Sequence, residues 1–199
     1  MEGLKLLGEI SSDLARLAKL PPSYDFQFKL RLQVRTIFSV LDALCFFLKS
    51  RALERCKDPE ATFSKTELGV LREGQVRKNP DGTESWRKIF PPPDQNIRTS
   101  ARCYAQLQGS PSPLDGQLPI PASFNAAAEV RHRLTHPKKL ADLTITSDEF
   151  AAVRETVEWL FGLFEWAFDS EKAYILALNS AMSQSIEKVL AAVRSPTTK

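Results

Sequence analysis

The sequence has little of three residue types from which common catalytic sites are built. Its 199 residues include eight glycines, three cysteines and two histidines. With so few glycines, it contains no G-x4-G-K-S/T phosphate-binding loop, no G-x-G-x-x-G turn and no G-x-S-x-G elbow. We therefore expect neither nucleotide hydrolysis nor serine-esterase chemistry.

The cysteines and histidines do not form a metal or disulfide pattern. Cys45, Cys56 and Cys103 are odd in number and show no C-x2-C spacing, which argues against both a disulfide framework and a zinc site. His132 and His136 lack the glutamate of an H-E-x-x-H motif, and no third histidine could complete a zinc shell. The sequence predicts no metal, no other cofactor and a reduced, cytoplasmic setting.

Long apolar runs are missing as well. No run approaches the roughly 20 residues that a helix needs to cross a bilayer. Gly8, Glu9 and Asp13 interrupt the leucines near the beginning of the chain, so we expect no signal peptide. Hydrophobic residues nevertheless make up 43% of the chain, which is ample for a core. We expect a soluble protein without membrane association.

Positive charge is concentrated in two segments. Residues 24–57 carry seven bases against three acids and residues 96–140 carry six against two, whereas the chain from residue 141 onward carries nine acids against five bases. If the two basic segments pack side by side, they would create a local field that attracts a polyanion such as RNA. The other interpretation is that these charges occupy solvated helix faces.

Helical periodicity dominates the chain and predicts an all-α fold. Apolar residues recur at intervals of three and four in four segments: about 4–20, 24–55 with Ser23 as its cap, 146–168 after the capping box of Thr146 and Glu149, and 170–194. We expect one domain over residues 1–199, an up-and-down bundle of four to five main helices. The aromatic residues of the third segment fit either the centre of the bundle or a dimer interface.

Residues from about 58 to 122 break this pattern and predict an irregular insertion. We expect a short helix after the capping box of Ser64 and Glu67, a hairpin around the turn at 79–82 and a helix from Asp94 to about Leu107. The hairpin interleaves bases with Trp86 and Phe90, as single-strand nucleic-acid platforms do, but nearby acids cancel most of its charge. An ordinary surface hairpin and an RNA contact are both consistent with this sequence.

Both histidines belong to one short helical segment, Phe124 to Pro137. On an ideal helix Arg131 and His136 lie about 140° apart, and His132 and His136 about 40° apart. Pro137 is expected to end the helix at His136. Arg131 supplies a permanent positive charge, and a histidine can move protons near neutral pH. Together these groups suit a phosphodiester, whose oxygens one side chain would clamp while the other moves its protons.

The stretch Arg-His-Arg-Leu-Thr-His-Pro resembles the signature of the HEPN superfamily of small helical proteins. That signature is an arginine, a polar residue directly after it and a histidine four to six positions beyond the arginine. Arg131, His132 and His136 occupy the matching positions, and nothing before about residue 120 adds to the resemblance. It implies an HEPN-like bundle, often dimeric, that is a metal-independent ribonuclease in many members and catalytically silent in others.

The resemblance also implies a mechanism and a set of partners. The 2′-OH of RNA would attack the adjacent phosphate, leaving a 2′,3′-cyclic phosphate and a 5′-OH, with His136 moving protons, Arg131 stabilising charge and His132 orienting or assisting. The expected role is a toxin–antitoxin or phage-defence one, with a restraining antitoxin as a partner. Residues expected to contact RNA are Arg133, Lys138, Lys139, Arg98 and Arg102.

An in-line reaction needs a base and an acid on opposite sides of the phosphorus, and one chain offers only two histidines. We therefore expect a homodimer in which two motifs form a composite site. The competing hypothesis is a non-catalytic helical module that binds a protein or RNA, in which Arg131 and His136 only stabilise the end of their helix.

Overall fold

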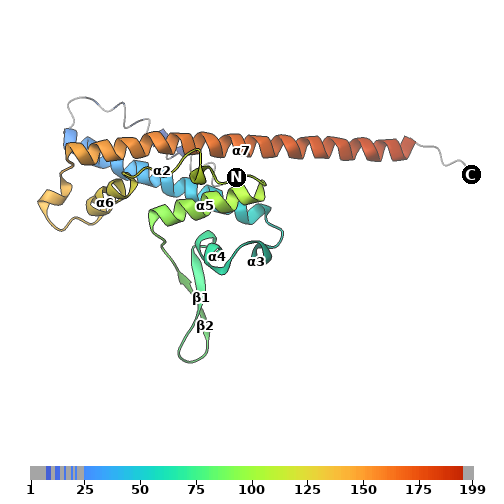
Figure 1. Ribbon diagram of the computed structural model, residues 1–199, viewed down its shortest axis with the longest axis horizontal. Coiled ribbons are helices and arrows are strands. Elements are labelled where there is room, and N and C mark those ends of the chain that lie inside the picture. The colour runs from blue at the N-terminus through green and yellow to red at the C-terminus, as the bar shows by residue number, and fades with distance from the viewer. Residues whose placement is uncertain are drawn as a thin grey trace, which may run out of the picture. The chain divides into compact units, whose positions relative to one another are not determined.

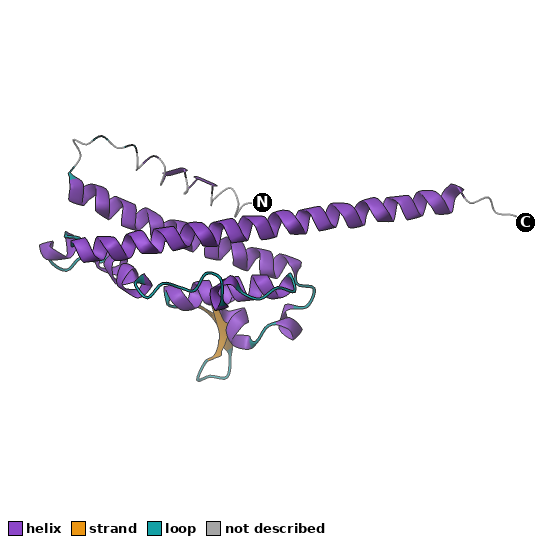
Figure 2. Cartoon of the chain, turned by 45° about the horizontal axis from the view of Figure 1, so that its top comes forward, coloured by secondary structure: helices purple, strands orange, loops and turns teal. Residues whose placement is uncertain are grey.

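The computed structural model of the protein describes residues 25–194, together with residues 8, 9, 12, 13, 16, 19 and 21. The helix expected from Leu4 to Leu20 lies outside the continuously described residues. Elements carry the labels of Figure 1, and Figure 2 shows that nearly all of them are helices. The all-α prediction with a small hairpin is confirmed. The elements in chain order are α2 (Phe26–Arg55), α3 (Pro59–Thr62), α4 (Lys65–Leu71), β1 (Gly74–Lys78), β2 (Glu84–Lys88), α5 (Pro93–Leu107), η1 (Pro113–Asp115), α6 (Phe124–Thr135), η2 (Leu140–Leu143) and α7 (Ser147–Arg194).

Helix α2 is a long helix that packs against three other helices. It contacts α4, α5 and α6, and α5 lies alongside it in both views (Figures 1 and 2). Its N-cap is Asp25, whose carboxylate accepts a hydrogen bond from the Phe28 amide, rather than the expected Ser23. The apolar seam predicted from its spacing is buried as expected, with exposed fractions of 5% or less: Leu30, Val34, Ile37, Leu41, Leu44 and Leu48.

The segment between α2 and α6 contains the elements that its turn signals predicted. Ser64 and Glu67 form a reciprocal capping box at the start of α4. Strands β1 and β2 pair antiparallel on either side of the turn at residues 79–83, and the hairpin projects away from the helices (Figure 1). Lys49 of α2 holds the base of this hairpin, since its buried ammonium donates to Glu73 Oε1 at 2.7 Å and to Asn96 Oδ1 at 3.2 Å.

Helix α7 differs from the sequence-based prediction. Two helices were expected with a break near Ser170, but the structure has one helix from Ser147 to Arg194. Asp169 is exposed, and no proline or glycine lies between it and the end of α7. Nothing at this point therefore obliges the helix to end. The capping box that opens α7 is confirmed, because the Thr146 amide donates to Glu149 Oε2 at 2.9 Å. None of the helices among the described residues is long and apolar enough to cross a membrane.

The chain divides into two compact units within α7. The first, Met1–Leu163, holds the helices around α2, the hairpin and both histidines. Trp159 joins this core, because its ring packs edge-on against Phe124 and its Nε1 donates to the Leu118 carbonyl at 3.1 Å. The second unit, Phe164–Lys199, contains the remainder of α7. Within it the rings of Phe164 and Phe168 stack with their centroids 6.0 Å apart.

Candidate functional site

Helix α6 presents one face to the core and leaves the other open. Its Phe124, Ala127, Val130 and Leu134 are buried at the intervals that one helix face requires. The helix ends where Pro137 predicted, at His136, whose amide donates to the His132 carbonyl at 3.0 Å. The motif residues therefore lie on the exposed side of the last turn of α6.

The two imidazoles form a pair on this open side. Their ring centroids are 5.3 Å apart with the planes tilted by 57°, so the rings are in near contact. Both side chains are exposed, and neither makes a hydrogen bond to any residue that the structure describes. Two unencumbered imidazoles at the end of a well-packed helix are available to a ligand from solution.

Arg131 directly precedes His132 in α6, and 39% of its side chain is exposed. Its guanidinium forms an ion pair with Asp42 of α2, Nη2 to Oδ2, at 3.4 Å. The Thr135 hydroxyl donates to the Arg131 carbonyl at 2.8 Å, the bond to the preceding turn that threonine commonly makes within a helix. Arg131 is therefore positioned but still accessible.

Asp42 is a site residue that the sequence analysis did not identify. Desolvation by its surroundings raises the pKa of its carboxyl above the ordinary value, and the positive charges of Arg131 and Lys49 oppose this only in part. More than half of the Asp42 side chain, 55%, is nevertheless exposed, so water screens these interactions. The signal in the sequence was a single acid within the apolar stretch Leu41 to Leu48 of α2.

Three side chains of α2 hold the backbone around the motif. Gln27, Arg31 and Arg35 are four residues apart and so share one helix face. Gln27 exchanges two hydrogen bonds with the backbone of Ile145, and Arg31 donates to the Leu143 carbonyl at 3.0 Å. Arg35 donates to the Leu134 carbonyl, inside the motif, at 2.6 Å. Charges that the sequence analysis assigned to a basic segment therefore fix the end of α6 and the loop after it.

Arg133 also belongs to this support. Its guanidinium donates to the Thr144 carbonyl at 2.9 Å and forms an ion pair with Glu149 at 2.7 Å. These bonds tie the end of α6 to the start of α7 and turn Arg133 away from the open side. It was expected to contact RNA, but its donors are engaged within the protein.

The remaining expected RNA contacts are distributed over two places. Lys138 and Lys139 follow the motif directly, and both side chains are exposed. Their amides donate to Asp142 Oδ2 at 2.8 and 3.1 Å, and these bonds lower the pKa of that carboxyl. Arg98 and Arg102 lie on α5, where Arg102 pairs with Glu67 at 3.0 Å. Among the described residues no hydrogen bond or ion pair joins these two arginines to α6.

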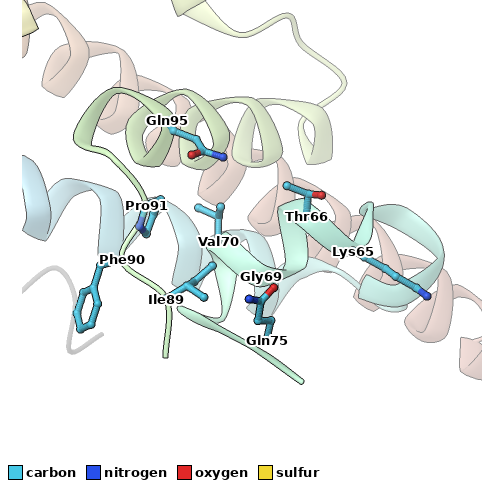
Figure 3. Close-up of a pocket in the computed structure, with 9 residues that line it drawn as sticks. All are labelled: Lys65, Thr66, Gly69, Val70, Gln75, Ile89, Phe90, Pro91 and Gln95. Carbon is cyan, nitrogen blue, oxygen red and sulfur yellow. The ribbon is translucent and has the colours of Figure 1, made fainter. Parts of the chain in front are cut away.

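Other chemistry has little support in the part of the chain that the structure describes. No group of three or more His, Cys, Asp and Glu side chains there could hold a metal ion. Burial raises the pKa of the Cys45 and Cys103 thiols to about 12, so neither is a ready nucleophile at neutral pH. A cleft of about 260 Å³ lies at the base of the hairpin (Figure 3), but Lys65 is the one charged side chain among its lining residues.

Comparison with models of known protein families, with curated proteins and with solved structures finds no match to this chain. Any function must therefore be argued from the site itself.

Proposed function

We propose that this protein is a metal-independent endoribonuclease of HEPN type, acting in toxin–antitoxin or phage-defence biology. The observation that carries the proposal is the pair of exposed imidazoles, His132 and His136, at the end of α6, with the partly exposed Arg131 in the same turn and the backbone beneath them tied to α2. Preorganised groups of this kind lower a reaction barrier because they need little rearrangement when charge develops.

The proposed reaction breaks the RNA chain without water as nucleophile. The 2′-oxygen bonds to phosphorus while its proton passes to a base, and the bond from phosphorus to the 5′-oxygen breaks while that oxygen accepts a proton from an acid. His136 is the proposed proton carrier, His132 assists or orients, and Arg131 stabilises charge on the phosphorane. The products are a 2′,3′-cyclic phosphate and a 5′-OH.

The contact between the two imidazoles supports a composite site. Ring centroids 5.3 Å apart leave no room for a phosphate between the two imidazoles, whereas an in-line displacement needs proton carriers on opposite sides of it. We propose that a second copy of the chain supplies the opposite group, so that the active species is a homodimer. An active protein that remains a monomer at the assay concentration would contradict this part of the proposal.

The decisive experiment incubates purified protein with mixed cellular RNA in excess chelator and reads the ends of the fragments. We expect cleavage that leaves cyclic phosphates and falls by at least about 100-fold in His136→Ala, the range typical of losing a general acid or base. Arg154→Ala is the matched control, because Arg154 is exposed on α7 and its ion pair with Glu158 is exposed as well. Cleavage that persists in His136→Ala would sink the assignment.

The second candidate is a non-catalytic helical module that binds protein or RNA. The observation in its favour is the Arg131 to Asp42 ion pair, which gives the arginine a partner within the protein. If Arg131 is structural, Arg131→Ala should lower the melting temperature, whereas a catalytic arginine should cost activity with little change in melting.

A further inference from the structure

The hairpin displays exposed apolar side chains on one of its two faces. Side chains alternate along a strand, and the pairing of Val76 with Trp86 places both on the same face. Val76 is 57% exposed and Trp86 is 54% exposed, while Phe90, just beyond β2, is 82% exposed. Lys88 stands over the Phe90 ring, with its Nζ 5.2 Å from the centroid. A group of exposed apolar side chains on a projecting hairpin is typical of a binding surface.

The Trp86 ring is held in place by a glycine. A Cβ atom at Gly74 would overlap the indole atoms Cε2, Cζ2 and Nε1 of Trp86, so the ring lies directly on the Gly74 backbone. A glycine within a strand normally weakens it, and close approach of another group is one reason to retain it. The indole is thus ordered against the strand although half of the side chain is open to solvent.

Most of the acids near the hairpin lie away from the face of Trp86. Glu73 is bound to the buried Lys49 at 2.7 Å, and Asp81 accepts bonds from the amide and hydroxyl of Thr83 at the tip. Only Glu84 then shares the face of Trp86. Lys78 and Lys88 lie on this face as well, whereas Arg77 and Arg87 lie on the opposite face, so two bases stand against one acid beside Trp86. The charge of the hairpin around the aromatic rings is therefore positive.

We propose that this face, with Trp86, Val76, Phe90, Lys78 and Lys88, binds single-stranded RNA by stacking an unpaired base on the Trp86 indole. The two lysines would contact the phosphates on either side. Stacking on aromatic rings beside a basic track is how proteins hold single strands with little dependence on sequence. The inference deepens the proposed ribonuclease function by naming unpaired RNA as its substrate class. The role of the hairpin in holding a substrate rests on that proposed function, whereas RNA binding by the hairpin does not.

Binding can be measured apart from cleavage with a 12-nucleotide 2′-O-methyl RNA, which has no 2′-OH to attack the phosphate. We expect it to bind, as read from the fluorescence anisotropy of a dye at its 5′ end, a signal that stays available when Trp86 is replaced. Trp86→Ala should weaken binding by at least about tenfold, the usual effect of losing one stacking ring. Gly74→Ala should do the same without removing any side chain, because the new methyl displaces the indole. Trp86→Phe should keep most of the affinity.

Phe161→Ala is the matched control, because Phe161 is an aromatic residue of α7 with 57% exposure. The affinity of this variant for the RNA should equal that of the wild type. Because the 2′-O-methyl RNA cannot be cleaved, its binding separates this inference from the proposed cleavage chemistry. Circular dichroism identifies any variant that fails to fold. If Gly74→Ala does not fold, the difference in affinity between Trp86→Phe and Trp86→Ala still shows whether an aromatic ring at this position binds the RNA. Unchanged affinity in folded Trp86→Ala, or equal binding to polyglutamate as a protein-like polyanion, would overturn the proposal.

Discussion

Basic side chains lie on both sides of the last turn of α6, but those on one side bond to the protein and those on the other face solvent. On the fixed side, Arg133 is bonded to the loop and to Glu149, and Arg35 reaches the Leu134 carbonyl. On the open side, Arg131 has a single exposed ion pair and both imidazoles face solvent. The difference teaches that a basic residue's role depends on the element that faces it, because a nearby carbonyl or carboxylate uses the donors that RNA would otherwise need.

The largest expected effect comes from comparing Arg133→Ala with Arg131→Ala. Arg133→Ala should lower the free energy of unfolding by about 2–3 kcal/mol, since it removes charge-assisted bonds that join α6 to α7. Arg131→Ala should cost less than about 1 kcal/mol, because its ion pair is exposed. Urea unfolding followed by circular dichroism measures both. Equal losses would show that the two sides of α6 do not differ as described.

A smaller effect is expected from Arg35→Met. The methionine fills similar space but leaves the Leu134 carbonyl without its donor, so the free energy of unfolding should fall by about 1–2 kcal/mol. Because that carbonyl lies within the motif, RNA cleavage should fall as well. Arg154→Ala serves as the exposed control and should leave both quantities unchanged. A stable Arg35→Met variant with full activity would mean that α2 does not organise the site.

The smallest effect concerns Asp42 and its dependence on pH. The pKa of the Asp42 carboxyl is raised in the folded protein, so folding favours the protonated carboxyl. The protonated carboxyl therefore stabilises the fold below its ordinary pKa of 3.8. This stabilisation is lost as the pH rises through the pKa of the folded protein. Asp42→Asn should therefore match the wild type near the acid end and be slightly more stable near neutral pH. With the side chain 55% exposed, the gain should stay below about 1 kcal/mol.

Urea titrations of wild type and Asp42→Asn at several pH values between 3 and 7 measure this difference. Asp169→Asn, at an exposed position of α7, provides the control for a general loss of negative charge. A variant that becomes less stable towards neutral pH would indicate that the pairing with Arg131 outweighs the desolvation of Asp42.

Much of the fold could be predicted because its signals are local. The seam of α2, both capping boxes and the hairpin turn depend on residues within a few positions of one another, and the structure has all of them. The break expected near Ser170 was wrong, since polar residues on an exposed helix face do not end a helix. The N-cap of α2 is Asp25 rather than the expected Ser23. A single sequence does not locate a helix end to within two residues.

The candidate site was predicted only in part. The end of α6 at His136 and the grouping of the two histidines follow from Pro137 and from helical spacing. Asp42 was missed because it lies 89 residues from Arg131 along the chain. Arg133 was expected to contact RNA, and nothing local in the sequence shows that Glu149 lies within reach of it.

The sequence by itself therefore determined the apolar seam of α2, the capping boxes, the hairpin turn and the set of chemical groups at the end of α6. Each of these depends on short-range hydrogen bonds and on the periodicity of apolar residues. Only the tertiary structure decided which charges are free, because packing α2 against α6 brings donors and acceptors together from distant parts of the chain. A buried donor gains more from a partner within the protein than an exposed one does, and that preference separates Arg35 and Arg133, which support the backbone, from the more exposed Arg131.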